Sequence, residues 1–226
     1  MKDHFSSLSG LYARFRPSYP KEMFDFLSSI TVEHDAAWDC GAGSGQIAYD
    51  LAERFRTVAA TDISEHQLRN AAPKQNIVCS VQQAEHSSFR DGSFDLITVA
   101  QAIHWFTFDA FYREAERTLK PEGIIAVIGY SLLKIEPEID AVITRFHDLV
   151  VGPYWDPERK YVDDEYRSIP FPFNEISAPG FTSIHSWTIE HLIGYLHTWS
   201  AVKAYKTATG SDPVEKISPP LLIISS

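Results

Sequence analysis

The sequence predicts an α/β fold in which a mostly parallel sheet carries helices on both of its faces. Over the first 131 positions, short apolar runs of strand length alternate with segments whose apolar residues recur at helical spacing. In addition, 44% of the 226 residues are hydrophobic, which is enough to bury one sizeable core. We therefore expect a single domain over residues 1–226.

The alternation begins with a helix over residues 21–30. Its apolar side chains recur on one side, namely Met23, Phe24, Phe26, Leu27 and Ile30. Residues 36–40 form a short apolar run that ends in glycines, which is typical of a buried strand before a turn. A helix over 47–54, a strand over 57–62 and a helix over 64–71 follow, the last with Ser64 as its N-terminal cap.

Turn residues delimit the next elements as well. Residues 77–82 are expected to form the third strand, and the Asp91-Gly92 turn precedes a fourth strand over 94–100. The helix predicted over 108–119 stops before Pro121, and residues 123–130 are the fifth strand. Right-handed crossovers then bring the carboxyl ends of all five strands to one edge, where ligands bind in such sheets.

The last third of the sequence is less regular. Residues 138–151 have apolar side chains at helical spacing, and prolines and aromatic residues between Pro153 and Pro179 predict an irregular element. We expect a strand over 181–189, a helix over 190–206 and a last strand over 221–224. The expected organisation is a ligand-binding core over 31–131, a region covering the site over 135–180, and C-terminal strands and a helix over 181–226.

Composition limits the classes of partner. The chain has 20 Lys and Arg against 30 Asp and Glu, a formal net charge of −10, and no basic block that would bind nucleic acid or an anionic membrane. No signal peptide or membrane-spanning run is recognised, and Cys40 and Cys79 lack metal-binding spacing. We therefore expect a cytoplasmic monomer or homodimer without a metal site that acts on a free small molecule.

A glycine-rich turn joins the first strand to the helix that follows it. The segment Asp39-Cys40-Gly41-Ala42-Gly43-Ser44-Gly45 places glycines where the backbone turns sharply and approaches a ligand. A dinucleotide site would need a further glycine at the position of Gln46. The acidic residue at the strand end instead suits a ligand that carries a positive ammonium group.

Asp62 ends the second strand, 17 positions beyond Gly45. A carboxylate at this point can accept hydrogen bonds from two ribose hydroxyls, and Ile63 beside it can lie against an adenine ring. Alone, Asp62 is equally well explained as the cap of the next helix, and the glycines as an ordinary tight turn. The two features in register favour a nucleoside bound across two strand tips.

These residues resemble class I S-adenosylmethionine-dependent methyltransferases, which have a Rossmann-like sheet. The branch they resemble is that of trans-aconitate methyltransferase. The branch-specific motifs are the opening Tyr12-Ala13-Arg14-Phe15-Arg16-Pro17-Ser18-Tyr19-Pro20 and the stretch Gln101-Ala102-Ile103-His104-Trp105-Phe106. The resemblance extends to Gly210-Ser211-Asp212-Pro213, after which members of this branch usually continue for longer, which leaves the last strand in doubt.

The resemblance implies a set of residues that bind S-adenosylmethionine and its product S-adenosylhomocysteine. It assigns the methionine end to Asp39, Gly41, Ala42 and Gly43, the ribose and adenine to Asp62 and Ile63, and the edge of the base to Ala84 and Glu85. Gln101 would contact the amino group of the cofactor. Arg16, after Tyr12, would pair with its carboxylate, because a guanidinium binds such a group bidentately.

His104 and Trp105 are the candidate catalytic residues, just past the fourth strand. His104 is a candidate base for a hydroxyl acceptor, a residue that orients the acceptor, or a packing residue. Trp105 could face the sulfonium or exclude water. Residues 152–173 are interpreted as a lid, in or near which Arg159, Lys160 and Arg167 could recognise an anionic acceptor, and the resemblance raises a carboxylic acid as that acceptor.

Two other functions remain open at this point. A non-catalytic module that binds the cofactor or a metabolite would keep the glycine turn and Asp62. An NAD-dependent oxidoreductase shares the fold class, although Gln46 in place of the last glycine argues against it.

Overall fold

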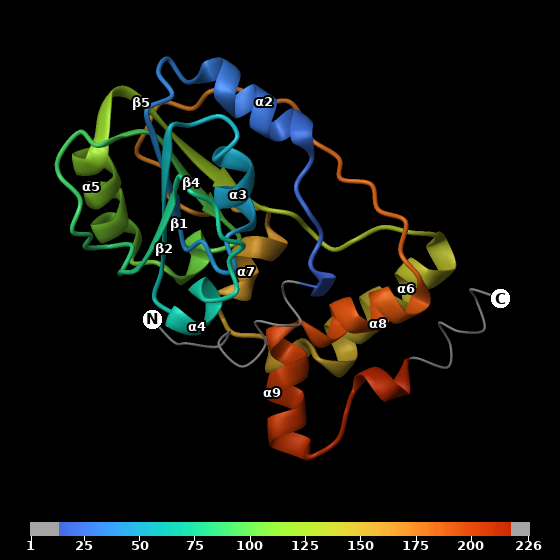
Figure 1. Cartoon of the computed structure of the whole chain (residues 1–226). Coiled ribbons are helices and arrows are strands. Elements are labelled where there is room, and N and C mark those ends of the chain that lie inside the picture. The colour runs from blue at the N-terminus through green and yellow to red at the C-terminus, as the bar shows by residue number, and fades with distance from the viewer. Residues whose placement is uncertain (1–13, 218–226) are drawn as a thin grey trace.

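The computed structural model describes residues 14–217 and contains a five-stranded parallel sheet in the order β3-β2-β1-β4-β5 (Figure 1). The strands are β1 (Ala36–Cys40), β2 (Thr57–Asp62), β3 (Ile77–Val81), β4 (Phe94–Ala100) and β5 (Leu119–Ile128). The predicted α/β class with a parallel sheet is confirmed, and the bounds of β1, β2 and β4 are as expected. The predicted strand over 221–224 and the site residue Tyr12 lie outside the described residues.

The central strands β1 and β4 are buried on both faces because helices cover each side of the sheet, whereas the edge strand β3 exposes Val78 and Val81. On one face, Ala37, Val58 and Leu96 pack with side chains from α2 (Lys21–Ile30) and α3 (Gln46–Leu51). On the other face, Trp38, Ile97 and Val99 pack with side chains from α5 (Phe108–Thr118). Neighbouring residues of one strand therefore enter opposite cores, as the period of two requires.

The connecting helices differ from the prediction mainly at their ends. Helix α3 ends at Leu51 and not at Arg54, because the chain tightens into a turn in which Arg54 N donates to Leu51 O. Helix α4 spans only Glu65–Leu68, and Ser64 caps it as expected, since its hydroxyl accepts from Gln67 N. Strand β5 starts earlier than predicted, at Leu119, directly after α5.

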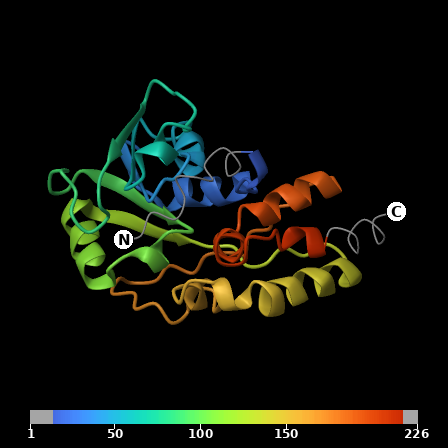
Figure 2. The same ribbon diagram turned by 90° about the horizontal axis from the view of Figure 1, so that it is seen from below.

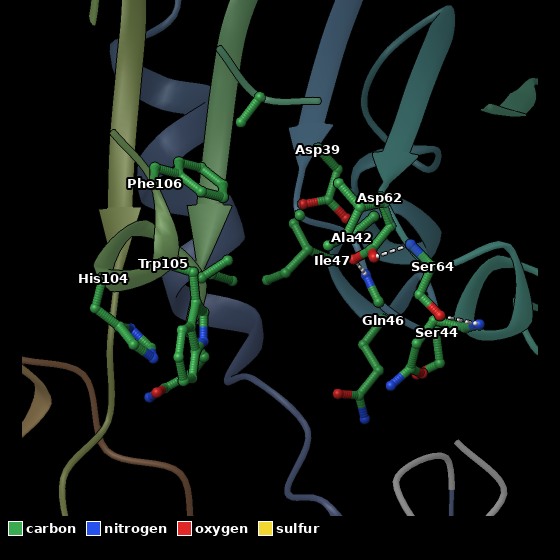
Figure 3. Close-up of a pocket in the computed structure, with 18 of the residues that line it drawn as sticks. Asp39, Ala42, Ser44, Gln46, Ile47, Asp62, Ser64, His104, Trp105 and Phe106 are labelled. Atoms are coloured by element: carbon green, nitrogen blue, oxygen red, sulfur yellow. Dashed lines mark hydrogen bonds between the residues drawn. The ribbon is translucent and has the colours of Figure 1, made fainter. Parts of the chain in front are cut away.

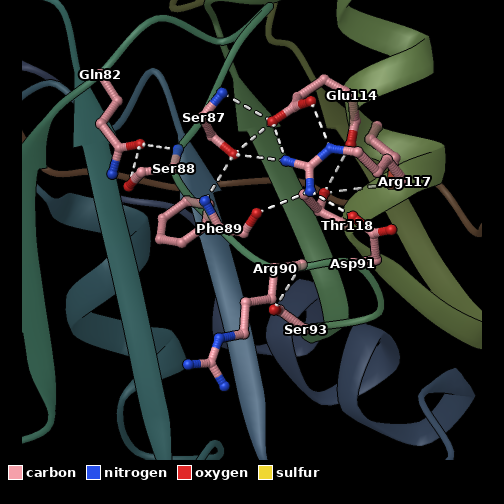
Figure 4. Close-up of polar contacts among 11 residues, drawn as sticks. Gln82, Ser87, Ser88, Phe89, Arg90, Asp91, Ser93, Glu114, Arg117 and Thr118 are labelled. Atoms are coloured by element: carbon pink, nitrogen blue, oxygen red, sulfur yellow. Dashed lines mark hydrogen bonds and ion pairs between the residues drawn. The ribbon is translucent and has the colours of Figure 1, made fainter.

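The loop between β3 and β4 is fixed to α5 by a polar network (Figure 4). One carboxylate oxygen of Glu114 accepts from the backbone N–H and the hydroxyl of Ser87, at 2.7 and 2.5 Å. Arg117 bridges Glu114 and Asp91 and donates to Phe89 O. This network holds in place the loop that carries Ala84 and Glu85.

The C-terminal part forms a helical cluster beside the sheet (Figures 1 and 2). It contains α6 (Pro137–Arg145), which continues as a π-helical turn over Phe146–Val150, together with α8 (Ile189–His197) and α9 (Ser200–Thr209). These helices share an apolar core that includes Ile143, Phe146 and Leu196. Between α6 and α8 lie a short 3-10 turn (Gly152–Tyr154) and α7 (Arg159–Asp163).

Two predictions for this region are wrong. The expected strand over 181–189 is irregular chain, because Phe181 packs against Phe26 of α2 while Ile184 is 88% exposed, which gives the segment no apolar face. The expected single helix over 190–206 is two helices. The break is at Trp199, whose extended backbone lets its ring enter the core against Phe146.

Candidate functional site

A cavity lies at the carboxyl edge of the sheet, between the strand tips and the helical cluster. It holds about 1400 Å³ of empty space, including its opening to solvent. Its walls come from the loop after β1, the ends of β2, β3, β4 and β5, residues 155–162, and α9. Figure 3 shows Asp39, Ala42 and Asp62 on one wall and His104 and Trp105 on the facing wall.

The glycine loop is anchored to β2 and presents open backbone to the cavity. Thr61 O accepts from the backbone N–H groups of Gly41 and Ala42 at 2.8 and 2.9 Å. Gly43 has a φ of 53°, in the left-handed region that favours glycine, and a Cβ added there would meet nothing within 4 Å. The space beside Gly43 is therefore available to a ligand that lies against the backbone.

Asp62 holds the tip of β2 and the glycine loop together. Its Oδ2 accepts from Gly43 N at 2.9 Å, and its Oδ1 accepts from Ser64 N at 2.8 Å (Figure 3). A carboxylate has about four lone-pair sites, so acceptance from these two N–H groups does not exclude hydrogen bonds to a ligand. The cap role and the ligand-facing role weighed for Asp62 are therefore compatible.

Asp39 is buried beneath the loop at the end of β1. Its Oδ2 accepts from Ala48 N in the first turn of α3 at 3.0 Å, and its Oδ1 accepts from the Thr98 hydroxyl at 3.2 Å. Burial raises the pKa of Asp39 to about 7, even though both hydrogen bonds act in the opposite direction. A positive group of a ligand in the cavity would favour the ionised carboxylate.

Most of the other predicted cofactor residues line the same cavity. Ile63, Ala84 and Gln101 are among them, and Gln101 has a φ of 53° at the tip of β4. The amide nitrogen of Gln101 donates to Tyr130 O at 3.0 Å. Glu85 is not among the lining residues, because its carboxylate turns away and accepts from Thr107 N at 2.9 Å.

Arg16 lies at the entrance of the cavity with Tyr19. Its guanidinium donates to the Tyr130 hydroxyl at 2.8 Å and to Thr198 O at 3.4 Å, and it lies over the Tyr195 ring. These partners belong to two parts of the chain, the segment after β5 and the end of α8, so Arg16 connects the N-terminal segment to both. The Arg16 side chain is partly buried and lines the cavity, so it is not an exposed surface residue.

His104 lies in a 3-10 turn (Ile103–Trp105) directly after β4 and is only 8% exposed. Its Nδ1 is 3.0 Å from the hydroxyl of Tyr166, and its ring contacts the Trp105 ring. Burial lowers the pKa of His104 to about 4, with a further contribution from the positive charge of Arg159. The imidazole is therefore neutral at physiological pH.

Only part of the predicted lid segment faces the cavity. Trp155, Asp156, Arg159 and Val162 line it, whereas Lys160 and Arg167 are exposed outside it. The last residues of the segment pack elsewhere, with Phe171 and Phe173 against Tyr112 of α5. The structure thus separates Arg159 from the other two cations considered for an anionic acceptor.

Several residues of the site could not be found from the motifs. Gln82 and Tyr130 line the cavity at the ends of β3 and β5, and their position at strand tips was the available signal. Ser44, Gln46 and Ser64 follow the predicted glycine loop and acid and complete the wall. Tyr166 has no sequence signal, because its contact with His104 joins positions 62 residues apart.

Within residues 14–217, no helix is long and apolar enough to cross a membrane. No group of three His, Cys, Asp or Glu side chains in that range is arranged to hold a metal ion.

Comparisons with known proteins agree with this geometry. Residues 38–127 match the family model of the methyltransferase domain. A Dictyostelium discoideum protein named as a methyltransferase is 37% identical over 224 residues, which cover 97% of this chain and 85% of that protein. A solved structure described as a type II methyltransferase from Anaeromyxobacter dehalogenans is 40% identical, with a TM-score of 0.83, over 91% of this chain and 87% of that one.

A malonyl-(acyl-carrier protein) O-methyltransferase of Geobacter sulfurreducens is 32% identical over 124 residues. The alignment covers 51% of this chain and 46% of that relative, so the chain spans about half of its length.

Proposed function

From the premise that this chain belongs to the class I S-adenosylmethionine-dependent methyltransferases, we propose that its acceptor is a small carboxylic acid methylated on a carboxylate oxygen. Membership in the family makes S-adenosylmethionine the methyl donor and S-adenosylhomocysteine the product. When bound, the donor supplies a methyl group on a positively charged sulfur. A nucleophile attacks the methyl carbon in line, and the sulfur leaves.

The residues that line the cavity support a proposed placement of this donor. We place the methionine end along Asp39, Gly41 and Gly43, where the open space at Gly43 admits a ligand against the backbone. We place the ribose hydroxyls at Asp62 and the adenine by Ile63 and Ala84, all of which line the cavity. Glu85 is left out of this assignment, because its carboxylate already accepts from Thr107.

The observation that carries the acceptor proposal is that His104 is buried in the cavity wall with a lowered pKa. A base that takes a proton from a hydroxyl works best when its pKa is near the operating pH, and the pKa of His104 is lowered to about 4. A carboxylate needs no base, since it is already ionised at neutral pH. The neutral imidazole then orients the acceptor by a hydrogen bond.

Arg159 supports an anionic acceptor on the same wall. Its Nε donates to Asp163 Oδ1 at 2.8 Å, and its guanidinium carbon lies 4.4 Å from the centroid of the Trp155 ring. These contacts hold the guanidinium while the positive charge acts on His104 inside the cavity. Such a fixed cation attracts a carboxylate and holds it near the donor, where proximity contributes most of the rate.

The Geobacter relative is named for O-methylation, in which the methyl group is also transferred to an oxygen atom.

Paired acceptors test the proposal. A panel of small acids, including malonate, citrate, trans-aconitate and benzoate, is compared with the corresponding carboxamides and alcohols, using labelled S-adenosylmethionine. We expect turnover of at least one acid and none of its amide or alcohol. Turnover of an alcohol or a carboxamide with no acid active would overturn the proposal.

Arg159 gives a matched control in the same assay. We expect Arg159→Met to raise the KM for the acid about tenfold or more, since a charge-assisted hydrogen bond to the acceptor is lost. Arg167→Met removes an exposed cation of the same segment and should leave that KM unchanged.

A further inference from the structure

Two consecutive residues after α7 have unusual backbone conformations. Glu165 has a φ of 58° and Tyr166 a φ of 63°, in the left-handed region that residues with a side chain rarely occupy. Such a conformation has an energetic cost and persists only where the surrounding structure determines it. The turn is fixed by Tyr166 N, which donates across it to Tyr161 O at 2.7 Å.

The consequence of this turn is the position of the Tyr166 side chain. Its ring enters the core beside β5, where a Cβ added to Gly129 would lie 2.7 Å from Cε2 of the ring. Gly129 therefore makes room for the Tyr166 ring because it has no side chain. Its backbone does not require glycine. The ring also lies nearly parallel to the imidazole of His104, with an angle of 26° between them.

The hydroxyl of Tyr166 ends at the ring of His104. The Oη–Nδ1 distance is 3.0 Å, and Nε2 of His104 has no hydrogen-bond partner among residues 14–217. His104 lines the cavity on the same wall as Trp105 (Figure 3). Burial raises the pKa of Tyr166, so its hydroxyl keeps its proton throughout the physiological range.

We propose that Tyr166 is a positioning residue whose hydroxyl donates a hydrogen bond to Nδ1 of His104. This bond keeps the imidazole proton on Nε2, from which the ring can donate a hydrogen bond to the acceptor. This inference rests on the proposed function for the identity of the acceptor. The position and tautomer of His104 can be measured without any acceptor.

The direction of the bond follows from the chemistry of the two groups. An imidazole nitrogen is a better hydrogen-bond acceptor than a phenol oxygen, and a phenol is the stronger acid compared with a neutral imidazole N–H. The bond therefore runs from Tyr166 to Nδ1. The neutral ring carries only one proton, which must then be on Nε2, as for other histidines whose tautomer is set by a second residue.

The tautomer is measured by nitrogen NMR of the imidazole in protein bound to S-adenosylhomocysteine at pH 7.5. We expect protonated Nε2 and bare Nδ1 in the wild type, and a mixture of tautomers in Tyr166→Phe, which keeps the ring and its packing. Tyr161→Phe removes a hydroxyl from the same segment and should leave the spectrum of His104 unchanged. An unchanged tautomer in Tyr166→Phe would overturn the proposal.

Kinetics with the most active acid of the panel give a second readout. Loss of one neutral hydrogen bond that orients His104 should raise the KM for the acid about fivefold to tenfold in Tyr166→Phe, with kcat changed less. Gly129→Ala should act in the same direction, because its methyl group displaces the Tyr166 ring. If no acid of the panel is active, the NMR result still decides the role of Tyr166, so the two failures are distinguishable.

A double variant separates positioning from general damage. In the Tyr166→Ala background, the space next to position 129 is vacated, so Gly129→Ala should cause little further change in the His104 spectrum. An additive effect of the two substitutions would mean that Gly129 acts independently of Tyr166, and the proposed reason for this glycine would be wrong.

Discussion

Replacing Asp39 by Asn should remove a pH dependence from the stability of the protein. The pKa of Asp39 is raised from its ordinary value of 3.8 to about 7, chiefly by burial. A carboxyl whose pKa is raised on folding contributes stability below its unfolded pKa and loses it as the pH rises through the folded pKa. A difference of about 3 pKa units corresponds to about 4 kcal/mol, of which about 3 kcal/mol falls between pH 5 and pH 8.

The Asp39→Asn variant is a close match to the wild type in its contacts. The new amide oxygen can accept from Ala48 N, and the new NH₂ group can donate to the Thr98 hydroxyl, so both present hydrogen bonds have a replacement. The variant has no charge to bury. We therefore expect it to gain about 3 kcal/mol relative to the wild type between pH 5 and pH 8.

Urea unfolding of both proteins at several pH values, without cofactor, measures this difference. All other titrating groups are common to the two proteins, so their contributions cancel. A stability difference that stays constant from pH 5 to pH 8 would mean that the pKa of Asp39 is not raised in the folded protein.

Three further predictions concern the two walls of the cavity. Asp62→Ala should weaken the binding of S-adenosylhomocysteine in calorimetry by about 2–4 kcal/mol, because its hydrogen bonds to the ribose and its anchor to Gly43 N are both lost; an unchanged affinity would reject the ribose assignment. Gly43→Val should abolish cofactor binding while circular dichroism still reports a folded protein, because the side chain fills space that is open in the structure and a β-branched residue strains a backbone with a φ of 53°; normal binding would place the ligand elsewhere. His104→Gln should raise the KM for the acid about tenfold and leave kcat within a few-fold in steady-state kinetics, whereas a fall in kcat of about 10² or more would identify His104 as a base.

Most of the sheet was predictable because three of its strands are clearly marked by local sequence, whereas the start of β5 was not. The runs over 36–40, 57–62 and 94–100 are apolar and end at turn residues, so composition and length suffice to place them. The cavity wall at the glycine loop was predictable for the same reason, since Gly41, Gly43 and Asp62 lie at the ends of those strands.

The other wall depends on contacts between distant parts of the chain. The conformation of Glu165 and Tyr166 is set by the space at Gly129 and by His104, and neither residue type favours a left-handed backbone. The division of residues 190–206 into two helices likewise depends on burial of Trp199 against Phe146, which belongs to another helix. No periodicity in the local sequence carries that information.

Some expectations from the sequence remain predictions. They include the single domain over 1–226, the cytoplasmic location, the state as monomer or homodimer, and the closing of residues 152–173 over the acceptor. Slower hydrogen exchange in that segment when S-adenosylhomocysteine and an acid are both bound would support its role as a lid.

The identity of the methylated product decides whether the acceptor is a carboxylic acid. The protein is incubated with cell extract and S-adenosylmethionine that carries an isotopic label in its methyl group, and labelled products are found by mass spectrometry. We expect the product to be the methyl ester of a small acid, with one labelled methyl group that mild alkali releases. A labelled product in which the methyl group resists alkali, on nitrogen, carbon or an ether oxygen, would contradict it.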